Sequence, residues 1–196
     1  MSERITLRTS DGETLEARWD VPSQPTGVVV VCPPHPLQDG SMMAPLLIAV
    51  TTRLNERGFS VLRFNFRGTG ASTGEHDYGE GELLDLTAAV AAARETGLSL
   101  HLSGWSFGAG VALHWLAGQG DPIPYAGIAP PPGDLPDELP GGPKRIVVGT
   151  RDQVIDVEAL RVYAGEHSID IVLTPGDHFF HGRGKKIGDL VAQGFE

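Results

Sequence analysis

The hydrophobic pattern of the chain alternates between short strand-like runs and longer helix-like runs. Two runs with a period of two open the chain, at residues 5–9 and 14–19, and the Asp11-Gly12 pair between them is a strong hairpin signal. Residues 27–32 are apolar at nearly every position and rich in valine, which is typical of a parallel strand covered on both faces. The pattern predicts further strands at residues 60–64, 98–103, 125–129, 145–149 and 169–173.

Helical segments separate most of these strands. The pattern predicts helices at residues 44–57, 81–95, 109–116, 157–165 and 185–195. By contrast, residues 33–41 contain three prolines and are predicted not to be helical. Because strands alternate with helices, the sequence predicts a single α/β domain over residues 1–196. It should have a mostly parallel twisted sheet of about eight strands, an N-terminal antiparallel hairpin at one edge, and helices on both faces.

The composition narrows the class of protein. Hydrophobic residues make up 40% and charged residues 20%, as in ordinary soluble domains. The net charge of −10 disfavours nucleic acid and anionic membranes as partners. No apolar run is long enough for a membrane helix, and the first residues lack the features of a signal peptide. Since the single cysteine, Cys32, cannot form an internal disulfide, we expect a cytoplasmic protein in which Cys32 is a small core residue.

The most specific chemical signal is the pentapeptide of residues 104–108, which reads Gly-Trp-Ser-Phe-Gly. It lies between a predicted strand and a predicted helix, which is the context of a nucleophile elbow. In that turn the hydroxyl of Ser106 is held at the carboxyl end of the strand and at the helix N-terminus, where negative charge is favoured. Ser106 is therefore the candidate nucleophile, and the alternative is an ordinary glycine-rich turn.

Three other motifs accompany the elbow, in residues 34–42, 65–74 and 176–182. With these motifs the chain resembles a compact member of the α/β-hydrolase superfamily. It is similar to the small bacterial hydrolases near the dienelactone-hydrolase branch, over about residues 5–190. The resemblance implies the α/β-hydrolase fold. The proline-rich residues 130–143 lie where lid domains are commonly inserted and are too few to form one, so we expect no cap domain.

A serine hydroxyl needs a base in hydrogen-bond contact and a third group that orients the base. The chain order expected for this fold is serine, acid, histidine. The resemblance places the base at His178, in the loop after the last predicted strand, and His181 is its competitor. Asp152 follows a predicted strand and should emerge at the same edge of the sheet as Ser106. Asp156 is the alternative acid.

Two backbone N–H groups should hold the oxyanion that forms during attack. One is the amide of Phe107, directly after the candidate nucleophile. The other should come from the loop after the third strand, where the prolines have no N–H and only His35 and Leu37 can donate. The aromatic side chains of Trp105 and Phe179 flank the predicted site, where they line a substrate pocket or belong to the core.

These residues predict a serine hydrolase that cleaves small carboxylic esters through an acyl-enzyme, without cofactor or metal, as a monomer or homodimer. The histidines and acids near His76 and His178 lack the complete ligand set that zinc requires. An uncapped site should favour short acyl chains. A thioesterase or small-peptide hydrolase would use the same triad. A non-catalytic binding module on the same fold is the remaining alternative.

Overall fold

The strands of the computed structural model, which describes residues 1–195, form a single eight-stranded sheet. They are β1 (Ser2–Arg8), β2 (Thr14–Asp20), β3 (Gly27–Cys32), β4 (Phe59–Phe64), β5 (Ser99–Trp105), β6 (Tyr125–Ile128), β7 (Lys144–Gly149) and β8 (Asp170–Thr174). Their order in the sheet is β1-β2-β4-β3-β5-β6-β7-β8. The β1–β2 and β2–β4 pairs are antiparallel and the other pairs are parallel. The predicted sheet and its hairpin edge are thus confirmed.

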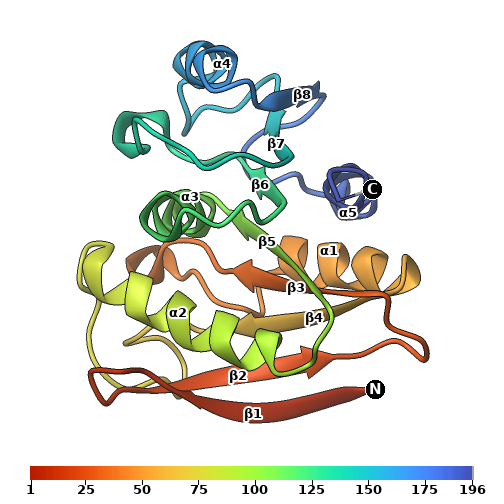
Figure 1. The fold of residues 1–196 in the computed structure, drawn as a ribbon. Helices are drawn as coiled ribbons and strands as arrows, with labels where there is room; N and C mark the ends of the chain where they lie inside the picture. Colours follow the sequence, from red (N-terminus) through yellow and green to blue (C-terminus); the bar gives the residue numbers. More distant parts are fainter. Residues whose placement is uncertain (196) are drawn as a thin grey trace.

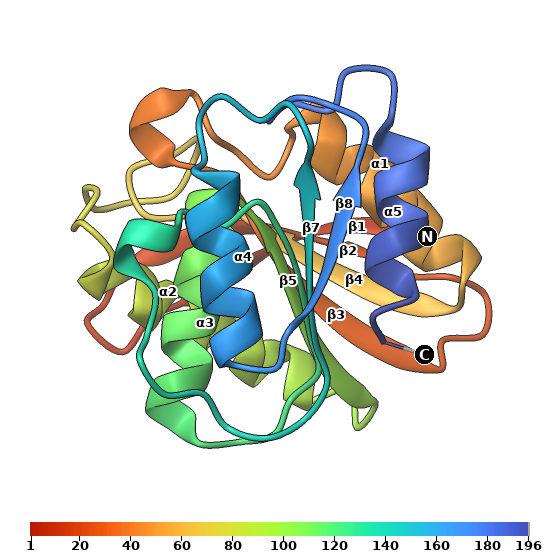
Figure 2. The ribbon, with the colours of Figure 1, turned by 90° about the horizontal axis from the view of Figure 1, so that it is seen from above.

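Helices cover both faces of the sheet. Within residues 1–195 they are α1 (Pro45–Glu56), α2 (Glu80–Arg94), α3 (Phe107–Gln119), α4 (Val157–Glu166) and α5 (Gly184–Ala192). Figures 1 and 2 show α1 and α5 on one face, and α2, α3 and α4 on the other. In the part of the chain that is described, no helix is both long enough and apolar enough to cross a bilayer.

The predicted helices are all present, with ends that differ by a few residues. The prediction that residues 33–41 contain no helix was wrong for one short 3-10 turn, Pro36–Gln38. The reason is that Pro36 occupies the first position of this turn, where its fixed φ is already suitable. Helix α3 begins at Phe107, earlier than predicted, because the elbow runs directly into its first turn.

The core lies between the sheet and its two helical layers. Every residue of β3 is buried, as its continuous apolar run predicts for a strand covered on both sides. Cys32 is buried at the end of this strand, and burial raises the pKa of its thiol. Cys32 is therefore a protonated core side chain.

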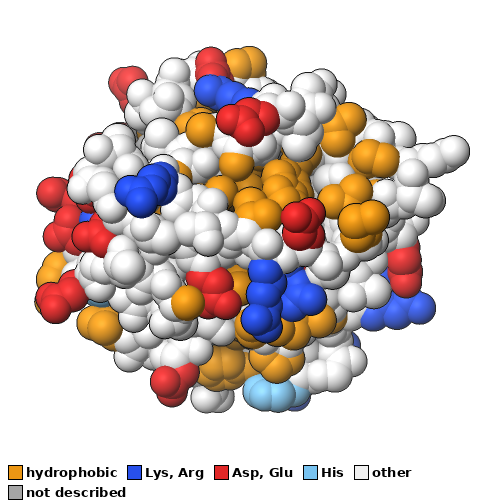
Figure 3. Space-filling model, turned by 90° about the horizontal axis from the view of Figure 1, so that it is seen from below, with side chains coloured by type: hydrophobic (Ala, Val, Ile, Leu, Met, Phe, Trp, Pro, Cys, Tyr) orange, Lys and Arg blue, Asp and Glu red, His pale blue; other side chains and the backbone are white. Residues whose placement is uncertain are grey.

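The β1 strand forms one open edge of the sheet. Its exposed side chains include Glu3, Arg4 and Arg8. Figure 3 views the molecule from this side and shows acidic, basic and apolar side chains intermixed on the surface. Charged side chains on an edge strand disfavour pairing with a strand of another chain.

The order of the strands locates the functional edge of the sheet. From β3 the chain proceeds to β4 on one side, whereas β5 to β8 follow one another on the other side. This reversal makes the boundary between β3 and β5 a topological switch point, and ligands of such sheets bind outside the carboxyl ends of the strands there. The loops after β3, β5, β7 and β8, which contain the predicted site residues, all leave at that end.

Candidate active site

Ser106 lies in a tight turn between β5 and α3. Its φ of 54° and ψ of −121° are rare for a residue other than glycine, and such strain is typical of functional positions. The Ser106 N–H donates to the carbonyl of Ile128 at 2.8 Å, and its own carbonyl accepts from the N–H groups of Ala109 and Gly110 at 2.9 and 3.2 Å. These bonds begin α3 directly at the turn. The strand–turn–helix context that the pentapeptide predicts is present.

The two glycines of the pentapeptide allow the backbone to pack closely around Ser106. A Cβ atom added at Gly108 would collide with the carbonyl oxygen of Pro33, in the loop after β3. A Cβ atom added at Gly104 would lie 2.7 Å from the carbonyl group of Gly108. The first turn of α3 is therefore pressed against both β5 and the loop that contains the predicted oxyanion donors.

We expect Gly108→Ala to lower the free energy of unfolding by about 1–3 kcal/mol, because the added methyl meets rigid backbone and not a flexible side chain. Gly118→Ala in the same helix is the control, since a Cβ atom there meets nothing within 4 Å. It should stabilise the protein by up to about 1 kcal/mol through helix propensity. Urea unfolding of both variants measures the difference, and equal stabilities would contradict the close packing at Gly108.

Asp152 and His178 form a buried hydrogen-bonded pair. The Nδ1 atom of His178 lies 2.8 Å from Oδ2 of Asp152, and their side chains are 6% and 0% exposed. The carboxylate can only accept, so Nδ1 carries the proton that it donates. The other carboxylate oxygen accepts from the N–H groups of Val154 and Ile155 at 2.9 and 3.0 Å. In the neutral imidazole this arrangement leaves Nε2 as the atom able to accept a proton.

Neighbouring strands bring this pair together. Asp152 follows β7 and His178 follows β8, and these strands are adjacent and parallel. The two loops are joined by a hydrogen bond from the N–H of Arg151 to the carbonyl of Gly176, at 3.0 Å. In the loop after β8, the Asp177 carboxylate accepts hydrogen bonds from the N–H groups of Phe179 and Phe180. This tight turn fixes the loop that contains His178.

The alternative acid and base lie outside this hydrogen-bonded pair. Asp156 is the N-cap residue of α4, where its carboxylate accepts from the N–H groups of Glu158 and Ala159 at 3.1 and 3.0 Å. His181 is exposed. The structure therefore pairs Asp152 with His178 and gives Asp156 a helix-capping position.

Two aromatic side chains connect this pair with the elbow. The ring of His178 lies 5.8 Å from the indole of Trp105, which directly precedes Ser106, and 5.5 Å from the ring of Phe179. Trp105 and Phe179 also contact each other edge to face, at 6.2 Å. Both line a cavity of about 330 Å³, which we call the His178-side cavity. The predicted pocket residues thus lie together beside the predicted base.

The predicted oxyanion donors belong to the first turn of α3 and to the loop after β3. Phe107 is the first residue of α3, so its N–H has no acceptor within the helix. The ring of His35 lies 4.8 Å from the ring of Phe107. The N–H of Leu37 already donates to Nδ1 of His35 at 3.2 Å, whereas the amide of His35 has no acceptor among the described residues. Of the two loop donors, His35 is the one left available.

The sequence interpretation missed a second buried pair, His76 and Glu82. Nδ1 of His76 lies 2.7 Å from Oε1 of Glu82, and both side chains are buried. The carboxylate also accepts from the N–H groups of Asp77 and Gly79, at the start of α2. The ring of His76 lies 4.8 Å from that of His35, and burial and the proximity of His76 lower the pKa of His35.

The available signal for this pair was the position of Glu82, three residues after the N-cap of α2, which is the spacing of a capping box. The sequence pattern relates His76 only to metal binding, for which its neighbours give an incomplete ligand set. Over residues 1–195 no group of three or more histidine, cysteine, aspartate or glutamate side chains is arranged to hold a metal ion. His76 and Glu82 instead support the loop of His35, one of the predicted oxyanion donors.

Comparison with known proteins identifies the family. No family model matches the chain. The structure is similar to XC6422 from Xanthomonas campestris, an α/β serine hydrolase without a lid, with a TM-score of 0.90 and 31% identity over 98% of this chain and 93% of that one. An α/β serine hydrolase homologue from Coxiella burnetii has the same TM-score and 28% identity, over 99% and 97% of the two chains.

The uncharacterized protein RP471 of Rickettsia prowazekii is 28% identical over 187 residues, which cover 85% of this chain and 77% of that protein. In this chain the serine turn follows β5 as in a nucleophile elbow. The segment between β6 and β7 holds only one 3-10 turn, Pro132–Asp134, so it forms no lid. Given the identity to XC6422 over nearly the whole length, the chain belongs to the α/β serine hydrolases without a lid.

Proposed function

We propose that this protein is a serine hydrolase that cleaves small carboxylic esters through an acyl-enzyme. Ser106 is the nucleophile, His178 the general base and Asp152 the residue that orients the imidazole. The observation that carries the proposal is the buried hydrogen bond between Asp152 and His178, beside the residue that precedes the strained Ser106. Membership in a family of serine hydrolases supports hydrolysis as the reaction class.

In the first half of the reaction, the Ser106 hydroxyl attacks the carbonyl carbon of the ester while Nε2 of His178 takes its proton. Negative charge develops on the former carbonyl oxygen. The N–H groups of Phe107 and His35 donate to that oxygen, since Leu37 is already bonded to the His35 ring. Asp152 stabilises the imidazolium that forms. When the intermediate collapses, His178 gives the proton to the departing alcohol and the acyl group stays on Ser106.

In the second half, a water molecule takes the place of the alcohol. His178 removes a proton from the water, which attacks the acyl carbon, and the same two N–H groups hold the second oxyanion. Collapse returns the proton to Ser106 and releases the carboxylic acid. Each proton that leaves an oxygen returns to one, so the reaction needs only these groups and water.

A small fluorophosphonate tests the nucleophile, because it forms a covalent bond with an activated serine. We expect one label on each wild-type chain and none on Ser106→Ala. Ser168→Ala is the matched control, since Ser168 has the same φ of 54° but is exposed and precedes β8, at the opposite end of the sheet. This variant should label like the wild type. Unlabelled wild type, or labelled Ser106→Ala, would contradict the proposal. Comparing kcat/KM for an ester and a thioester of the same acyl group then shows whether an alcohol or a thiol is the preferred leaving group.

A further inference from the structure

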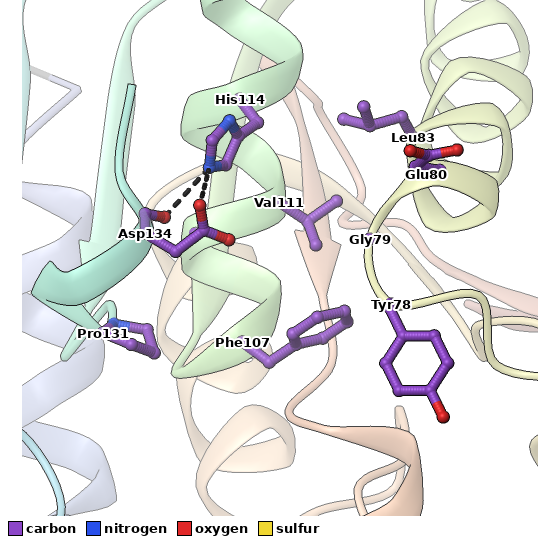
Figure 4. A pocket seen from close by; sticks show the side chains of 10 residues that line it. Tyr78, Gly79, Glu80, Leu83, Phe107, Val111, His114, Pro131 and Asp134 are labelled. Carbon is purple, nitrogen blue, oxygen red and sulfur yellow. Dashed lines mark hydrogen bonds and ion pairs between the residues drawn. The ribbon is translucent and has the colours of Figure 1, made fainter. Parts of the chain in front are cut away.

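The two residues that flank Ser106 line two different cavities. Trp105 lines the His178-side cavity, whereas Phe107 lines a second cavity of about 310 Å³ between α3 and the start of α2. We call this second cavity the α3 groove. Its walls include Phe107, Val111 and His114 of α3, and Leu83 of α2 (Figure 4). Because these two residues adjoin the nucleophile in the chain, the two cavities offer separate places for the two halves of an ester.

The position of His178 indicates which cavity takes the alcohol half of the ester and which takes the acyl half. A general acid has to lie within hydrogen-bond reach of the oxygen that it protonates, so the alcohol must leave on the side of His178. On that side lies the cavity of Trp105 and Phe179, whose rings both contact the ring of His178. The acyl group extends from the same carbonyl carbon in another direction. The other cavity beside Ser106 is the α3 groove.

We propose that the α3 groove binds the acyl group of the substrate and selects linear, uncharged, apolar acyl chains of about six to eight carbons. This inference rests on the proposed ester hydrolysis. It also changes the expectation of short acyl chains, because the groove provides an apolar site without a cap domain.

The length follows from the spacing of the groove residues along α3. Phe107, Val111 and His114 are four and three residues apart, so they share one face of the helix. At a rise of 1.5 Å per residue, Phe107 and His114 are separated by roughly 10 Å. An extended chain advances about 3.5 Å for every three bonds, so this span corresponds to about nine bonds at most, and an acyl chain of about six to eight carbons fits within it. His114 marks the far end of this row, and its Nε2 lies 2.9 Å from the carbonyl oxygen of Asp134, which holds the ring in place (Figure 4).

The chemistry of the walls sets the polarity of the acyl chain. Phe107, Val111 and Leu83 present apolar surface, and each methylene buried there should raise kcat/KM by about fourfold. The acidic groups at the groove are Glu80 and Asp134, and His114 and Tyr78 are the remaining titratable side chains of the described lining. A terminal carboxylate on the acyl chain would therefore meet two like charges.

Tyr78 is a further sign that this groove binds a ligand. Its side chain is 85% exposed, and its φ of 52° is unusual for an aromatic residue. Figure 4 shows its ring across from Phe107, at the Ser106 end of the groove. An acyl chain entering the groove would cover both aromatic rings.

The test compares p-nitrophenyl acetate, hexanoate and dodecanoate. We expect kcat/KM of the wild type to be on the order of 10²-fold higher for hexanoate than for acetate, and lower again for dodecanoate. Gly110→Leu should reduce the hexanoate-to-acetate ratio at least about tenfold, because Gly110 lines the groove and a Cβ atom there meets nothing closer than 3.9 Å. Gly118→Leu, the same change on the exposed part of α3, should leave both rates unchanged.

Two further measurements keep the test independent of the folding of Gly110→Leu. The mono-p-nitrophenyl ester of adipic acid matches hexanoate in length but ends in a carboxylate, and we expect it to react at least about tenfold more slowly. His114→Ala removes the ring at the far end of the lining and should shift the optimum toward longer chains. A wild type that prefers acetate, an unchanged ratio in folded Gly110→Leu, or equal rates for the two six-carbon esters would each overturn the groove assignment. If Ser106-dependent hydrolysis of acetate persists, the proposed function stands; a wild type that hydrolyses none of the esters contradicts both.

Discussion

His178→Ala should lower kcat/KM for p-nitrophenyl acetate by about 10²- to 10⁴-fold, which is the usual contribution of a positioned general base. Without the imidazole, no group in the site accepts the proton of Ser106 as the bond to the carbonyl carbon forms. The hydrogen bond from Nδ1 to the buried carboxylate of Asp152 fixes this ring in place, beside the indole of Trp105 that precedes Ser106. Steady-state kinetics at neutral pH measure the loss.

His181→Ala is the matched control for this measurement. The two histidines are three residues apart on one loop, but His181 is exposed whereas His178 is bonded to Asp152. We expect His181→Ala to lower kcat/KM by less than about tenfold, because its ring lines the His178-side cavity next to Phe179 but has no contact with the acid. A fall of less than tenfold in His178→Ala, or a larger fall in His181→Ala, would remove His178 as the base.

Asp152→Asn should lower kcat/KM by up to about 10⁴-fold without unfolding the protein. The asparagine keeps an oxygen that accepts from the N–H groups of Val154 and Ile155, so the loop retains its hydrogen bonds. Its NH₂ group, however, replaces the oxygen that faces His178. This group donates to Nδ1 and leaves the proton on Nε2, where the imidazole can no longer accept from Ser106.

Asp156→Asn provides the control for the acid. Asn and Asp are equally good N-cap residues, so this change should preserve both α4 and the activity. Thermal unfolding checks that both variants are folded, and kinetics with p-nitrophenyl acetate separate them. Equal activities for the two variants would show that Asp152 does not orient the base.

The elements of the fold could be predicted because their signals are local. The alternation before and after Asp11-Gly12 gives the hairpin, and the continuous apolar run of β3 gives a buried central strand. The pentapeptide around Ser106 likewise specifies its own turn. Only glycine fits at positions 104 and 108, because an added Cβ atom at either position would meet backbone atoms. Local sequence was less informative at the 3-10 turn after His35, where prolines act as both helix breakers and favourable first residues.

The pairing of the site residues with one another could not be predicted from local sequence in the same way. Asp152 and Asp156 lie on one loop, and only the adjacent position of β7 and β8 brings Asp152, and not Asp156, against His178. The choice between His35 and Leu37 depended on where the His35 ring lies in the folded loop.

The sequence by itself determined the strands and helices, the elbow at Ser106 and the short set of candidate acids, bases and donors, because periodicity and turn chemistry act between residues close along the chain. The tertiary structure alone decided the buried pairs Asp152–His178 and His76–Glu82, and the groove between α3 and α2. These features depend on which strands and helices become neighbours. The packing of the whole core determines which elements are neighbours, so no short segment of the sequence predicts it.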